Sequence, residues 1–161
     1  MEKIINPVRK NKKIQSFQKT GFSNRVKIYT DGGARGNPGP AGIGIVFYGQ
    51  KNNLIKKYAQ AIGEKTNNQA EYEAVIFALK KAKKLKFKNV ECFSDSELIV
   101  NQLSHKYKIK DEKLQPLFIQ AWNLTVDFNK ISFHHIPREQ NKEADKLVNE
   151  ALNNKQKGFF E

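Results

Sequence analysis

The chain has 161 residues, which is enough for one folded domain with a substantial hydrophobic core. Its formal net charge of +13 favours a polyanionic partner such as a nucleic acid, although lysines that only cover the surface would give the same balance. The single cysteine, Cys92, excludes an internal disulfide and a cysteine-based zinc cluster, and no apolar run is long enough to cross a bilayer.

Residues 1–24 form a basic segment with few apolar positions. Its cationic residues stand among Asn, Gln and Ser and are Lys3, Arg9, Lys10, Lys12, Lys13 and Lys19. We interpret the segment as a flexible arm that contacts phosphates, or as a leader without a role, and the composition leaves both readings open. Because Lys and Arg interrupt it throughout, it does not resemble a signal peptide, and we expect a cytoplasmic protein.

Hydrophobic periodicity predicts a folded domain over residues 25–154, followed by a short tail, 155–161. Apolar residues alternate with polar ones in the strands, and recur every three or four positions in the helices. The expected strands are 26–31, 43–48, 54–62, 90–94 and 131–136, and the expected helices are 67–85, 96–103, 113–128 and 141–153. Three strands followed by alternating helices and strands predict an α/β fold. Its five-stranded mixed sheet has three antiparallel strands, then parallel ones, and is flanked by helices.

Two aspartates follow apolar strands in this order. Asp31 precedes a glycine-rich reversal in the string YTDGGARGNPGPAG, and Asp95 follows the strand that ends at Ser94. The carboxyl ends of parallel strands lie at one edge of a sheet, which is where α/β proteins place their sites. If the two strands are parallel neighbours, both carboxylates emerge at the same edge.

Two further acids lie on helices. Glu71 falls in the first turns of the long helix, where Thr66 or Asn67 can cap it, and Asp145 lies in the last helix. Each acid alone has an ordinary explanation as a cap or a surface charge. Four acids that the topology brings to one sheet edge would repel unless cations bound them, and oxygen ligands suit Mg²⁺ or Mn²⁺. A pair of such ions catalyses phosphodiester cleavage in other enzymes.

These strings together resemble the type 1 ribonuclease H family over roughly residues 25–153. The resemblance rests on the Asp31 string, on TNN leading to Glu71, on SDS around Asp95, and on Asn141 before Asp145. It implies the ribonuclease H-like fold, two Mg²⁺ ions for which Mn²⁺ can substitute, and endonucleolytic cleavage of the RNA strand of RNA/DNA hybrids. The implied products carry 5′-phosphate and 3′-hydroxyl ends.

The resemblance also implies roles for particular residues. The catalytic and metal-binding carboxylates would be Asp31, Glu71, Asp95 and Asp145. The substrate-binding positions would be Gly32, Asn37, Thr66, Asn67 and Asn68. An assisting residue before the last acid is either Arg138 or His135, and we favour Arg138, whereas His134 is expected to be an ordinary sheet histidine.

The chain departs from many members of that family in one respect. It lacks a lysine-rich helical protrusion, so it resembles the protrusion-free branch found in archaea and some bacteria. We expect the arm and the loop that carries Lys106, Lys108 and Lys110 to supply affinity for the substrate instead. Cleavage of double-stranded RNA as well, or an inactive nucleic-acid-binding module, are the alternatives. We expect a monomer without a membrane partner.

Overall fold

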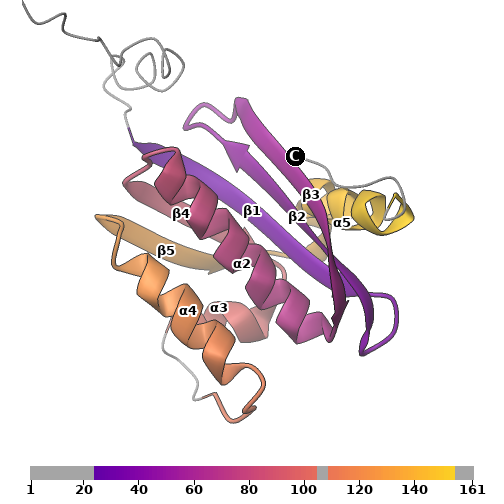
Figure 1. The fold of residues 1–161 in the computed structure, drawn as a ribbon. Coiled ribbons are helices and arrows are strands. Elements are labelled where there is room, and N and C mark those ends of the chain that lie inside the picture. The colour runs from indigo at the N-terminus through magenta and orange to yellow at the C-terminus, as the bar shows by residue number, and fades with distance from the viewer. Residues whose placement is uncertain (1–23, 105–108, 155–161) are drawn as a thin grey trace, which may run out of the picture.

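The computed structural model describes residues 24–104 and 109–154, which form a five-stranded mixed sheet in the order β3-β2-β1-β4-β5 (Figure 1). The strands are β1 (Arg25–Ala34), β2 (Gly39–Tyr48), β3 (Leu54–Lys65), β4 (Asn89–Ser94) and β5 (Lys130–His135). β2 pairs antiparallel with β1 and β3, whereas β4 pairs parallel with β1 and β5. The predicted fold class and strand directions are confirmed.

Helices cover the two faces of this sheet unequally. The helices are α2 (Asn67–Lys84), α3 (Glu97–Leu103), α4 (Gln115–Thr125) and α5 (Lys142–Asn153), with a 3₁₀ turn, η2 (Arg138–Gln140). The main hydrophobic core lies between the sheet and α2, α3 and α4, and it includes Val26, Ile28 and Tyr72. α5 packs on the other face, over β2 and β3 (Figure 1).

The start of α2 is fixed by local hydrogen bonds. Thr66 is the N-cap: its Oγ1 accepts from the Gln69 N–H at 3.2 Å, while the Thr66 N–H donates to Gln69 Oε1 at 2.9 Å. Together these bonds form a capping box. Glu71 therefore falls in the second turn of the helix, and the first turn contains no acidic residue.

Most element boundaries lie within one residue of the sequence prediction, and the larger differences are in β1, β2, β3 and α4: β2 begins at Gly39 rather than 43, β3 ends at Lys65 rather than 62, and α4 ends at Thr125 rather than 128. β1 continues through Asp31 to Ala34 because its pairing with β2 persists, although its parallel pairing with β4 ends at Thr30 and Ser94. α4 begins at Gln115 rather than 113, which places Pro116 in the first turn, where a missing N–H costs nothing.

Two glycines let helices approach the sheet backbone closely. A Cβ at Gly32 of β1 would lie 2.2 Å from the carbonyl oxygen of Ala70 in α2. A Cβ at Gly44 of β2 would lie 2.2 Å from the carbonyl oxygen of Ala144 in α5. In each helix the next residue is an acid, Glu71 or Asp145, so these contacts set how near the two acids lie to β1.

Candidate active site

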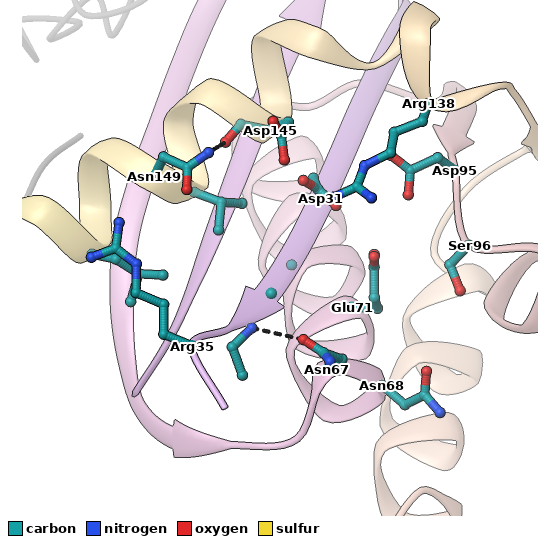
Figure 2. Close-up of a pocket in the computed structure, with 15 residues that line it drawn as sticks. Asp31, Arg35, Asn67, Asn68, Glu71, Asp95, Ser96, Arg138, Asp145 and Asn149 are labelled. Carbon is teal, nitrogen blue, oxygen red and sulfur yellow. Dashed lines mark hydrogen bonds between the residues drawn. The ribbon is translucent and has the colours of Figure 1, made fainter. Parts of the chain in front are cut away.

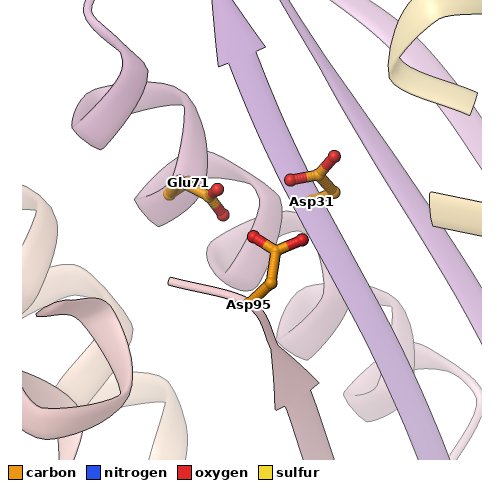
Figure 3. A group of neighbouring side chains, drawn as sticks. All are labelled: Asp31, Glu71 and Asp95. Atoms are coloured by element: carbon orange, nitrogen blue, oxygen red, sulfur yellow. The ribbon is translucent and has the colours of Figure 1, made fainter. Parts of the chain in front are cut away.

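Three carboxylates from three different elements meet at one edge of the sheet (Figure 3). Asp31 comes from β1, Glu71 from α2, and Asp95 directly follows the last residue of β4. One oxygen of each lies within 4.8 Å of the others, in an arrangement that could hold a metal ion. The expected convergence of Asp31 and Asp95 is therefore present, and Glu71 joins them from the helix side.

Burial makes this cluster electrostatically costly. Asp31 and Glu71 are only 7% and 9% exposed. Burial, followed by the charges of Asp95 and Asp145, raises the pKa of Asp31 from 3.8 to about 7. Burial and the neighbouring carboxylates raise the pKa of Glu71 well above its usual value, and Glu71 Oε2 has no hydrogen-bond partner. A cation bound among these oxygens would remove both costs.

Asp145 completes the set from the opposite side of β1. It lies on α5 and lines, with the three clustered carboxylates, an open cavity of about 500 Å³ (Figure 2). Asp145 is not part of the group whose oxygens lie within 4.8 Å of one another, but its charge contributes to the raised pKa of Asp31. All four predicted carboxylates thus face one cavity.

Asn141 links three of the elements that carry these acids. It is 1% exposed and directly precedes α5, and its Nδ2 donates to the Thr30 carbonyl at 2.9 Å and to Asp95 Oδ2 at 3.2 Å. One side chain therefore ties the start of α5 to β1 and to the end of β4. Sequence reasoning recognised Asn141 only as part of a motif, because its bonds join residues far apart in the chain.

The predicted substrate-binding asparagines organise the hairpin beside the cavity. The Ala34 N–H donates to Asn67 Oδ1 at 2.9 Å, and the Asn67 N–H donates to Asn37 Oδ1 at 3.0 Å. Within the described residues the Nδ2 groups of both side chains donate no hydrogen bond, so these amides remain as donors. Asn67, Asn68 and Gly32 line the cavity, whereas Asn37 and Thr66 lie beside it.

The two candidate assisting residues lie in different places. Arg138, in η2, lines the cavity, and Figure 2 shows its side chain directed into the cavity on the side of Asp95. His135 ends β5, is exposed, and is not among the cavity-lining residues of the described chain. His134 stacks on Phe93 and lies 2.8 Å from Ser132 Oγ, which fits a sheet histidine.

Several cavity residues were not predicted from the sequence, and Arg35 and Asn149 are two of them. Arg35 lies in the hairpin and donates from Nη2 to Asn153 Oδ1 at 2.6 Å, and Asn149 lies one helical turn after Asp145. The spacing of four residues could have indicated Asn149. Nothing in the sequence pairs Arg35 with the end of α5.

Several predicted features fall outside the described residues. These are the arm up to residue 23, the tail 155–161, and Lys106 and Lys108; Lys110 is described and exposed. Across the described helices, none combines the length and apolarity that a membrane span requires.

Comparisons with known proteins find relatives over most of the chain. The family model described as "Reverse transcriptase-like" matches residues 29–151. Ribonuclease HI of Halobacterium salinarum is 41% identical over 128 residues, which cover 80% of this chain and 64% of that protein. The bifunctional protein Rv2228c of Mycobacterium tuberculosis is 41% identical over 129 residues, 80% of this chain but 35% of that protein. The chain thus spans only part of both relatives.

A solved structure resembles the described fold closely. LC11-RNase H1, in complex with an RNA/DNA hybrid, superposes with a TM-score of 0.78 and 46% identity, covering 81% of this chain and 99% of that one.

Proposed function

This chain belongs to the type 1 ribonuclease H family, and on that premise we propose that it is an endonuclease that hydrolyses the RNA strand of RNA/DNA hybrids. The convergence of Asp31, Glu71 and Asp95 on one another carries the proposal. In the reaction a water oxygen bonds to phosphorus as the bond to the 3′ oxygen breaks. The products then carry 5′-phosphate and 3′-hydroxyl ends.

We propose that the carboxylate site holds two divalent ions, Mg²⁺ with Mn²⁺ as a substitute. Asp31, Glu71, Asp95 and Asp145 would hold them, since all are oxygen ligands and Glu71 Oε2 is buried without a partner. Such ions orient and activate water and stabilise a leaving oxygen when bound. Asn141 holds Asp95 in place through its Nδ2, so this ligand is positioned before any ion arrives.

Arg138 is the assisting residue that the geometry favours. Its guanidinium lies on the same cavity as the four acids and provides planar donors for phosphate oxygens. We propose that it orients the scissile phosphate and moderates its charge. His135 remains the weaker candidate because it does not line the cavity.

The polar edge beside the acids would recognise the hybrid. Asn37 and Asn67 use their Oδ1 atoms internally, and their Nδ2 groups can donate to 2′-hydroxyls in a wide, shallow minor groove. Asn68 extends this edge along the cavity, and Gly32 lets α2 come close enough to form it. Thr66 would contribute to a phosphate pocket on the DNA strand. Because none of these contacts would read base identity, we expect little sequence preference.

Cleavage of double-stranded RNA as a second activity stays a prediction, as do a monomeric state and a cytoplasmic location. The alternative of an inactive binding module is less well supported, because all four acids are present and face one cavity.

The test is cleavage of an end-labelled RNA strand that is paired with DNA, paired with RNA, or left single, in Mg²⁺ and in EDTA. We expect metal-dependent cuts throughout the hybrid and none in the single strand. Cuts in the RNA duplex would add the second activity. Binding without cleavage, in Mg²⁺ or in Mn²⁺, would contradict the proposal and identify an inactive binding module.

A further inference from the structure

Side chains from neighbouring strands form rows across one face of the sheet, and these rows continue from the carboxylates toward the amino-terminal ends of β1 and β4. Parallel register places Tyr29 beside Phe93 and His134, and Arg25 beside Asn89 and Lys130. Alternation puts these rows on the same face of β1 as Asp31. From Asp31 to Arg25 the strand runs about 20 Å, at roughly 3.3 Å per residue.

Within the described residues, this part of the sheet face is accessible at Arg25, Glu91, Lys130 and His134, which are exposed. α5 covers β2 and β3, where Val46 and Ala59 pack against Leu147 and Ala151. Figure 1 shows α5 beside β2 and β3 and away from β5. A hollow of about 660 Å³ lies over the amino-terminal ends of β1, β4 and β5.

The hollow is strongly basic. Its charged lining residues are four cations, Arg25, Lys27, Lys51 and Lys130, and one acid, Glu91. Arg25 and Lys130 are exposed, and within the described residues neither forms an ion pair. Because the hollow carries excess positive charge, it attracts a polyanion and repels the basic arm of this same chain.

A stack of rings crosses the face between the hollow and the carboxylates. Tyr29 and Phe93 stack with centroids 4.9 Å apart, and Phe93 and His134 stack at 5.1 Å. The stack ends at His134 because β5 is the edge strand, and Ser132 Oγ holds the imidazole through Nε2 at 2.8 Å. A nucleobase added beyond His134 would continue the stack.

From these features we propose that the open face of β1, β4 and β5 binds single-stranded nucleic acid. A base stacks on His134, and phosphates contact Arg25 and Lys130. A single strand fits better than a duplex, whose bases are already stacked and paired. This proposal rests on the proposed function in one respect: the bound strand would be a single-stranded extension of a hybrid that is held at the carboxylates.

The test is fluorescence anisotropy of a labelled 15-nucleotide thymidine DNA strand with the full chain in EDTA, over a series of salt concentrations. His134→Ala should weaken binding at least about fivefold, because stacking contributes about 1–3 kcal/mol per base, and His134→Phe should restore it. The double variant Arg25→Gln, Lys130→Gln should reduce the salt slope by about 1.4, or roughly 0.7 for each phosphate that is no longer neutralised. The matched control, Lys80→Gln with Lys113→Gln, removes the same charge from exposed sites elsewhere and should leave the slope unchanged.

An equal change of slope in the control variant would show diffuse attraction and overturn the proposal. So would binding by His134→Ala that equals the wild type, or no binding at low salt. If removal of residues 1–23 tightened binding of the strand, the arm would be the occupant of this face, and that result would also overturn the proposal. Because the DNA strand is not cleaved and no metal is present, these results are independent of whether the hybrid is hydrolysed.

Discussion

At the scale of single residues, the site is defined by carboxyl groups that are poorly solvated. Asp31 keeps a proton up to about pH 7 because it is buried beside Asp95 and Asp145, and Glu71 keeps one through its own burial. A protein would not retain such repulsion for stability alone. These acids lower the folding stability when no cation is bound, and the cations of the proposed function would offset that cost.

The pH dependence of the folding stability of Asp31→Asn tests this explanation. The pKa of Asp31 is higher in the folded chain than in the unfolded one, so the folded state binds more protons. The metal-free wild type should lose stability as pH rises from about 4 to about 7. Asparagine does not ionise, so at pH 8 without metal the variant should be more stable by on the order of 2–4 kcal/mol, and equally stable at pH 4. Urea unfolding at both pH values measures this.

Glu150→Gln is the matched control, since it removes an exposed acid from α5 and should change stability little at either pH. Excess Mg²⁺ at pH 8 should stabilise the wild type more than Asp31→Asn. A metal-free Asp31→Asn protein that is less stable than the wild type at pH 8 would contradict the electrostatic account.

Arg138 and His135 can be separated by substitution. Arg138→Ala should lower kcat for hybrid cleavage about 10- to 100-fold, because a charge-assisted hydrogen bond contributes about 1.5–3 kcal/mol. His135→Ala should leave kcat nearly unchanged, since this side chain does not line the cavity. Steady-state kinetics decide between them, and the reverse order of effects would reassign the assisting role to His135.

At the scale of elements, two helices reach the sheet only because glycines lie beneath them. Gly32→Ala would place a methyl group against the Ala70 carbonyl, so α2 must move away and carry Glu71 with it. We expect the free energy of unfolding to fall by about 1–3 kcal/mol and metal binding to weaken. Calorimetric titration with Mn²⁺ and urea unfolding measure both.

The neighbouring position provides the control for this substitution. A Cβ at Gly33 would lie 3.7 Å from Val148 Cγ1, an ordinary contact, so Gly33→Ala should be nearly neutral. Equal effects of the two substitutions would show that the contact with α2 does not position Glu71.

The same scale separates what the sequence predicts from what it does not. Period-two alternation around Ile28 predicts β1 correctly because one face of that strand is buried, whereas β2 is buried on both faces around Ile45 and is predicted because its bulkiest apolar residues still alternate. The extension of β1 to Ala34 depends on pairing with β2, and the bonds of Asn141 and Arg35 join distant segments. Local patterns contain no signal for such contacts, so they could not be predicted.

At the scale of the whole molecule, charge is distributed so that a few acids face one cavity on a strongly basic chain. The net charge of +13 attracts polyanions over distances near the Debye length, and the proposed cations would neutralise the four carboxylates that otherwise repel a phosphate. Substrate affinity should therefore depend strongly on salt.

The arm is predicted to contribute to that affinity. Deletion of residues 1–23 spares Asn24, whose carbonyl accepts the Lys88 and Asn89 N–H groups, and removes six cationic residues. We expect KM for the hybrid to rise at physiological salt with kcat nearly intact, and the salt slope to fall by about 0.9 for each phosphate that the arm neutralises. A Gly/Ser segment of equal length in place of the arm is the control for length, and an unchanged KM would show that the arm has no part in binding.

The central claim is that the carboxylate cluster catalyses hydrolysis of the hybrid. Its most direct test is the single-turnover rate of RNA-strand cleavage in Mg²⁺, with saturating enzyme, for the wild type and for Asp31→Asn. Removal of several kcal/mol of transition-state stabilisation predicts that the variant is slower by about a thousandfold while still binding the hybrid. A variant that cleaves the hybrid at the wild-type rate would contradict the assignment of this site.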